Sequence, residues 1–136
     1  MKKSDQINEL AKALCTFQGK IKNVKKESKN PFFKSNYADI ASILDEIRIP
    51  LAECGLSVSQ FPIGENEMYS ILLHVSGQWI EGSYIMKPVK NDPQGLGSCI
   101  TYQRRYALNA ILGLASEDDD ANVAAQPSKK IEPNKT

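Results

Sequence analysis

Apolar residues make up 41% of the 136-residue chain and charged residues 24%, and 17 lysines and arginines nearly balance 16 aspartates and glutamates, for a formal net charge of +1. This length and apolar content predict one globular domain with a hydrophobic core. The chain has no continuous apolar run of about 18 residues and no N-terminal apolar segment typical of a signal peptide, so it supports neither a membrane span nor secretion. We therefore expect an intracellular protein.

The charges are distributed unevenly along the chain. Residues 1–37 contain nine lysines against Asp5, Glu9 and Glu27, whereas residues 117–120 are all acidic. A basic N-terminal region attracts phosphate groups, and an acidic run either faces a basic patch on a neighbouring copy or repels DNA from the wrong surface. The basic N-terminal region therefore favours an anionic partner, although the net charge of the whole chain is only +1.

The first helix is predicted at residues 4–19, with Ser4 or Asp5 as N-cap and Gly19 at its end. Residues 21–26 then alternate apolar and basic side chains, which predicts a strand with exposed lysines.

The segment NPFFKSNY, residues 30–37, places aromatic rings among lysines. This pattern suits single-stranded nucleic acid, because lysines follow the phosphates and rings stack on bases, at about 1–3 kcal/mol per base. The alternative is structural: we expect at least one of Phe32 and Phe33 to enter the core, and Tyr37 suits a helix entry. The candidate DNA-binding residues of this region are Lys25, Lys26, Lys29, Lys34, Phe33 and Tyr37.

A second helix is predicted at residues 39–54, because apolar side chains recur there within a narrow arc of the helical wheel. Pro50 predicts a kink, since proline lacks a backbone donor. Ile49 falls on the polar side and is a candidate subunit contact.

Residues 56–62, 68–75 and 79–89 alternate apolar and polar side chains and are separated by the short segments GENE and SGQ. This arrangement predicts an antiparallel β-meander. His74 is the only histidine, and because no partner ligand is near it in sequence we expect neither a catalytic nor a metal role. We expect the three cysteines to be small core residues, two of them on buried helix faces, rather than disulfide or metal ligands.

The third helix is predicted from Pro93 to Gly113, with Asp92 as N-cap. Helical periodicity places Leu96, Ile100, Gln103, Ala107, Ala110 and Ile111 on its buried face, and Ser98, Thr101, Tyr102, Arg105 and Asn109 on the outward face, with Arg104 at the flank. The guanidinium fork binds phosphate oxygens and a tyrosine ring stacks on bases. The candidate DNA-binding residues here are Arg105, Arg104, Tyr102 and Thr101; an ordinary amphipathic helix with a solvated arginine side fits the spacing equally well.

The run LGSCITYQRRYALNAILGLASEDDDAN, residues 96–122, resembles the signature of the Erf (essential recombination function) family of single-strand annealing proteins of phages and bacteria. NPFFKSNYADIASILDEIRIPLAECGLSVSQ and SGQWIEGSYIMKPVKNDPQ resemble two further segments of the same family. The resemblance implies an α+β fold, in which the meander of about three to four strands packs against two or three helices. We expect this domain at residues 1–122 and a disordered tail at residues 123–136.

The resemblance also implies a protein without catalytic chemistry that binds single-stranded DNA and anneals complementary strands in phage-type homologous recombination, in the cytoplasm of a bacterial host. It implies assembly into a ring or filament, and a single-stranded DNA-binding protein or an exonuclease is a candidate partner. The residues themselves show no Walker loop, metal-ligand spacing or nucleophile–base pair, so we expect no cofactor and no ATP requirement.

Two alternatives remain open. One is a magnesium-dependent nuclease that uses Asp118 and Asp120 together with Asp39 or Asp92. The other is a non-enzymatic scaffold for recombination or replication partners, in which the acidic residues bind another protein.

Overall fold

The computed structural model describes residues 1–22, 39–88 and 92–115. Their elements, in chain order, are β1 (Lys2–Lys3), α1 (Asn8–Lys20), α2 (Ile40–Glu53), β2 (Leu56–Ile63), β3 (Glu67–His74), β4 (Trp79–Ile85) and α3 (Pro93–Leu112). Within this part of the chain there are three helices and one four-stranded antiparallel sheet, which confirms the predicted α+β fold. The segments at residues 23–38 and 116–136, with most of the strand predicted at 21–26, lie outside the described residues.

The sheet has the order β1-β4-β3-β2, so the three long strands form the predicted meander. Tight turns join them, and Gly64 and Gly77 take positive φ angles of 64° and 95° there, a conformation that glycine adopts without steric cost. The short strand β1 was not predicted. It pairs with the start of β4, with Lys2 opposite Glu81 and Lys3 opposite Ile80.

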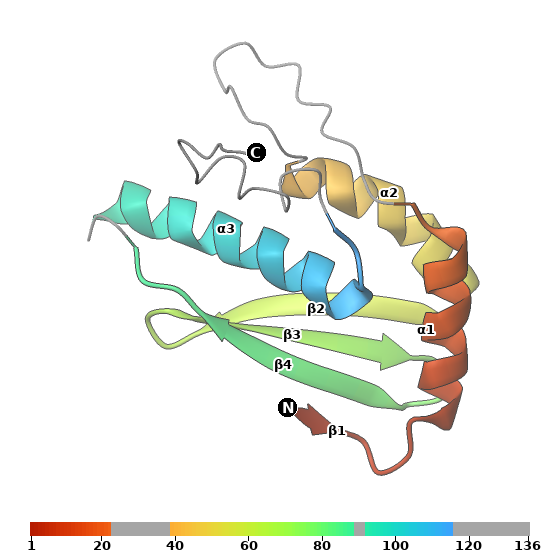
Figure 1. Cartoon of the computed structure of the whole chain (residues 1–136). Helices are drawn as coiled ribbons and strands as arrows, with labels where there is room; N and C mark the ends of the chain where they lie inside the picture. Colours follow the sequence, from red (N-terminus) through yellow and green to blue (C-terminus); the bar gives the residue numbers. More distant parts are fainter. Residues whose placement is uncertain (23–38, 89–91, 116–136) are drawn as a thin grey trace, which may run out of the picture.

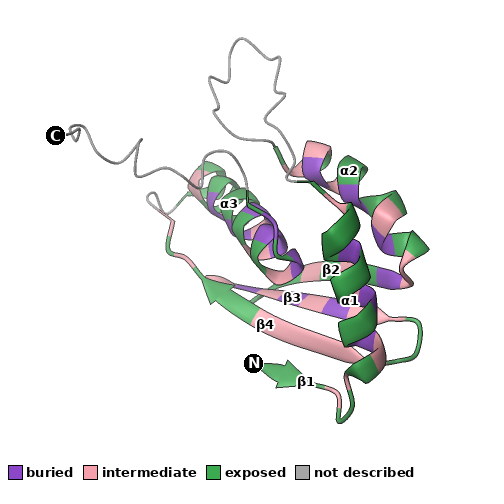
Figure 2. Cartoon of the chain, turned by 45° about the vertical axis from the view of Figure 1, so that its right-hand side comes forward, coloured by how far each residue is buried: buried purple, intermediate pink, exposed green. Residues whose placement is uncertain are grey.

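The described helices pack against one face of the sheet. Figure 1 shows α3 running along the length of the strands. The helix α1 stands across the end of the sheet that lies away from the start of α3. The buried residues of the helices lie on the sides that face the sheet and one another (Figure 2). Leu10, Phe17, Ile43, Ile47, Leu56, Leu72, Leu108 and Leu112 belong to this core cluster.

The first helix begins later than its sequence predicts, at Asn8 rather than near Ser4. Ser4 is not a cap: its backbone N–H donates to the carbonyl of Trp79, and its hydroxyl accepts from the Trp79 N–H at 3.0 Å. The pairing of β1 with β4 thus holds Ser4 beside the sheet. The helix also continues through Gly19 to Lys20, so the predicted end at Gly19 is wrong.

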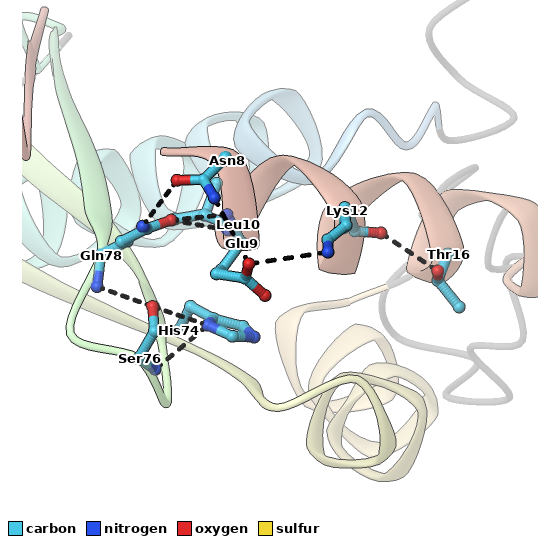
Figure 3. Close-up of polar contacts among 8 residues, drawn as sticks. All are labelled: Asn8, Glu9, Leu10, Lys12, Thr16, His74, Ser76 and Gln78. Atoms are coloured by element: carbon cyan, nitrogen blue, oxygen red, sulfur yellow. Dashed lines mark hydrogen bonds and ion pairs between the residues drawn. The ribbon is translucent and has the colours of Figure 1, made fainter. Parts of the chain in front are cut away.

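The N-terminus of α1 is capped by a residue far away in sequence. The side-chain oxygen of Gln78, in the β3–β4 turn, accepts hydrogen bonds from the backbone N–H groups of Glu9 (2.8 Å) and Leu10 (2.9 Å), and its amide donates to Asn8 (Figure 3). These contacts satisfy N–H groups that a helix start leaves without intrahelical partners. They also fix α1 to the end of the sheet.

The second helix lies within the predicted range 39–54, and Asp39 is its N-cap. The Asp39 carboxylate accepts a hydrogen bond from the Ser42 N–H at 2.8 Å, and Pro50 lies within the helix. Ile43, Ile47 and Leu51 are buried, as their spacing predicts.

Candidate nucleic-acid interface

The third helix begins and ends where its local signals indicate. The Asp92 carboxylate accepts from the Gly95 N–H at 2.7 Å, Pro93 occupies the first turn, and Gly113 ends the helix in the left-handed conformation with φ 73°. Next to this end, the Gln18 amide of α1 donates to the carbonyl of Leu112 at 3.2 Å. The start of α3 is therefore fixed by a local cap, and its end by a hydrogen bond from α1.

Two glutamine side chains attach α3 to the sheet. The buried amide of Gln103 donates to the carbonyl of Asn66, in the β2–β3 turn, and to the carbonyl of Tyr84, near the end of β4. In the opposite direction, the Gln60 amide of β2 donates to the Ser70 hydroxyl at 2.9 Å and to the carbonyl of Arg104 at 3.1 Å. Because these bonds are directional and partly buried, they fix the rotation of α3 about its axis.

Tyr102, Arg105 and Tyr106 form a cluster on α3. The two tyrosine rings stack with centroids 6.0 Å apart and an interplanar angle of 17°. The Arg105 guanidinium carbon lies 4.8 Å from the Tyr102 centroid and 4.9 Å from the Tyr106 centroid, within the range of a cation–π interaction. Arg105 is only 2% exposed, whereas each tyrosine is 37% exposed.

This burial corrects the predicted position of Arg105. Its sequence position suggests an outward guanidinium in contact with phosphate, but the structure places it against the two tyrosine rings, away from solvent. Asn109, also predicted outward, is buried, while Leu96 and Ile100, predicted buried, are exposed.

These differences from the predicted buried face arise because α3 packs against two parts of the fold, the sheet and the helices α1 and α2. Cys99 and Gln103 hydrogen-bond to the β3–β4 side of the sheet, and Leu108 and Leu112 pack in the core shared with α1 and α2. These two contact sides are separated by more than 100° on the helical wheel, so a single apolar arc does not describe the buried surface.

A groove of about 300 Å³ runs beside the first half of α3. Its walls are formed by Met86, Lys87, Pro88, Gln94, Gly95, Ser98, Cys99 and Tyr102. The Cys99 thiol donates to the carbonyl of Met86 at 3.2 Å, which ties the helix to the segment after β4. Lys87 and Ser98 are exposed. The groove thus combines an aromatic ring, apolar side chains and a solvent-accessible ammonium group.

The other predicted residues of α3 are partly accessible. Thr101 is exposed, with its hydroxyl donating to the carbonyl of Gly97, and Tyr102 is exposed beside it. Arg104 is half-buried and, among the described residues, forms no ion pair within 4.0 Å. The remaining predicted residues, Lys25, Lys26, Lys29, Lys34, Phe33 and Tyr37, lie outside the described part of the chain.

The groove and the contact of Tyr106 with Tyr102 and Arg105 were not predicted from the sequence. The i, i+4 spacing of Tyr102 and Tyr106 was the available signal, since residues four apart are neighbours on a helix surface. Lys87 carried a weaker signal, as a basic residue near the end of the strand predicted at residues 79–89.

The acidic residues proposed for a nuclease have structural roles where they are described. Asp39 and Asp92 cap α2 and α3, and no group of three histidine, cysteine, aspartate or glutamate side chains in residues 1–22, 39–88 and 92–115 could hold a metal ion. Asp118 and Asp120 lie outside these ranges.

His74 and the three cysteines have no metal-binding arrangement among the described residues. Ser76 N–H donates to Nδ1 of His74 at 3.1 Å, so the ring supports the turn after β3 (Figure 3). All three cysteines are free thiols; Cys99 is buried, Cys54 half-buried and Cys15 exposed. The core role expected for the three cysteines therefore holds for Cys99, only in part for Cys54, and not for Cys15. None of the described helices has the length and apolar character that crossing a membrane requires.

Comparison with known proteins identifies the family. The sequence model of the ERF superfamily matches residues 10–136, so the chain belongs to this superfamily. No curated protein and no solved structure matches the chain significantly. Membership supports a role in recombination and annealing, as the sequence resemblance implies.

Proposed function

We propose that this member of the ERF superfamily binds single-stranded DNA and anneals complementary strands without ATP, in the recombination of phage or prophage DNA. Besides the family itself, one observation carries the proposal: the stacked rings of Tyr102 and Tyr106 lie on the exposed side of α3, and Tyr102 also lines the groove that contains Lys87. Aromatic faces beside a lysine are the combination that single-stranded nucleic acid requires.

The contacts in this proposal do not read the DNA sequence. The Tyr102 ring offers its accessible surface to any base, and Lys87 pairs with a backbone phosphate. Thr101, which is exposed next to Tyr102, and Arg104, which is half-buried on another side of α3, are further proposed contacts. Arg105 is a positioning residue in this account, because its guanidinium holds the two tyrosine rings rather than a phosphate.

Annealing needs no catalytic group in the protein. Base pairing itself supplies the free energy, and the protein has only to hold a strand by its backbone while most bases stay available to pair. Phosphate contacts by single lysines are weak and sensitive to salt, so a long strand requires many linked copies. We therefore propose homo-oligomeric assembly, with Lys25, Lys26, Lys29, Lys34, Phe33 and Tyr37 as further DNA contacts.

The proposal is tested by fluorescence anisotropy of a labelled single-stranded oligonucleotide over a salt series. Lys87→Ala should weaken binding for every sequence and reduce the salt slope by about 0.7, the value for one phosphate contact with a single strand. Lys12→Ala is the matched control, since Lys12 is an exposed lysine on α1, at the other end of the sheet. Equal losses in both variants would remove the groove from the site, and absence of binding by the unmodified protein at low salt would contradict the function.

A further inference from the structure

The outer edge of β2 has no partner among the described residues. β2 is the last strand of the sheet. The Val75 N–H donates to the carbonyl of Gly55, so the odd-numbered residues of β2 form the hydrogen bonds with β3. The backbone N–H and C=O groups of Leu56, Val58 and Gln60 therefore point away from the sheet, and no described group hydrogen-bonds to them.

Among the described residues, this edge lacks the protection that the opposite edge has. On the opposite side the sheet ends in β1, which has two residues, both lysines. Short strands and lysines are common devices against unwanted edge pairing. β2 has eight residues, LSVSQFPI, without a single charge, and its only blocking residue is Pro62. An uncharged strand edge of this length favours pairing with another strand.

We infer that a second copy of this chain pairs with β2 edge to edge, antiparallel about a twofold axis at Val58. In this register Leu56 lies opposite the partner's Gln60, and Val58 lies opposite the partner's Val58. The three outward residues of each strand then form about six backbone hydrogen bonds. The contact joins two four-stranded sheets into one continuous sheet.

Pro62 and the lack of charge select this register. Moving the axis toward Gln60 would place Pro62 opposite Val58, where its missing N–H would lose a hydrogen bond. With the twofold axis at Val58, the last paired residue is Gln60, and the pairing ends before Pro62. Because the strand is uncharged, self-pairing also places no like charges opposite each other.

The contact is isologous, so by itself it closes into a dimer. A ring or filament would require a second, different contact. The inference specifies one contact of the homo-oligomer in the proposed function, but it does not rest on DNA binding, because β2 and the groove with Lys87 lie on separate elements.

Charge substitutions at Ser57 and Ser59 test the register. Both side chains are exposed, and the twofold axis places each opposite the other residue of the partner. Ser57→Lys/Ser59→Lys should therefore set like charges face to face and raise the dissociation constant by about tenfold in analytical ultracentrifugation. Ser57→Lys/Ser59→Glu should pair opposite charges and keep the association of the unmodified chain. Equal dissociation constants for the two variants would overturn the inference.

Hydrogen exchange of the full chain provides a second measurement that does not depend on variants. The outward amides of Val58 and Gln60 should become protected as protein concentration rises through the association range. The amides of Ser57 and Ser59, which face β3, should be protected at all concentrations and serve as internal controls. Protection of Val58 that does not change with concentration, or its absence in the associated protein, would overturn the inference.

Discussion

The Arg105 guanidinium lies 4.8 Å from the centroid of the Tyr102 ring, although the two residues were predicted to point side by side into solvent. Together with Tyr106, this contact turns an apparent phosphate ligand into the support of an aromatic surface. In our proposal Tyr102 contacts DNA, whereas Arg105 holds the tyrosine rings in place.

Arg105→Ala should lower the free energy of unfolding by about 1–3 kcal/mol, because it removes a buried side chain and its contacts with both tyrosine rings. Arg105→Lys should recover only part of this loss, since an ammonium group lacks the planar face that packs on a ring. Urea unfolding measures both. Unchanged stability with uniformly weaker DNA binding would instead show that Arg105 contacts phosphate.

Gln78→Ala should destabilise the protein by about 1–2 kcal/mol, because the N–H groups of Glu9 and Leu10 lose their acceptor at the start of α1. Gln78→Glu keeps an acceptor oxygen and adds a negative charge near the helix N-terminus, so it should be close to the unmodified protein in stability. Thermal unfolding of the three proteins checks this cap. If the alanine and glutamate variants were equally unstable, the side-chain oxygen would not be the stabilising group.

Alanine should change stability in opposite directions at Gly97, inside α3, and at Gly113, which follows its last residue. Gly113 has a φ of 73°, and an added Cβ would collide with the Gln18 amide, so Gly113→Ala should destabilise by about 1–2 kcal/mol. Gly97 is inside the helix with open space around its Cα, so Gly97→Ala should stabilise by about 0.5–1 kcal/mol. Urea midpoints distinguish them, and a loss of stability in both would contradict the described packing of α3.

Gln103→Leu should cost about 1–3 kcal/mol in spite of its similar volume. The amide is buried and donates to the carbonyls of Asn66 and Tyr84, which would lose that donor. Chemical denaturation gives the loss, and Gln94→Leu, on the exposed first turn of α3, is the control. A neutral effect at Gln103 would show that its hydrogen bonds do not fix the helix.

Local signals predicted the parts of the fold that depend on neighbouring residues. Asp92 caps α3 as predicted, the second helix lies within its predicted range, and alternating apolar residues located the three long strands. The start of α1 could not be predicted in this way, because Ser4 pairs with Trp79 and the cap comes from Gln78, about seventy residues away.

The candidate site was predicted only in part, for a similar reason. Thr101 and Tyr102 are exposed as their helical positions indicate. The burial of Arg105 depends on how α3 is rotated, and that rotation is set by hydrogen bonds from Gln103 and Gln60 to distant elements. Periodicity along one helix contains no information about a second packing partner.

The central claim is annealing, and its most direct measurement is the rate at which two complementary fluorescent oligonucleotides pair in the presence of the protein, with EDTA and without ATP. We predict faster pairing of complementary strands only, lost at high salt, reduced by Lys87→Ala and unaffected by Lys12→Ala. Binding of single strands without any acceleration of pairing, or acceleration only with ATP or a divalent ion, would contradict the account.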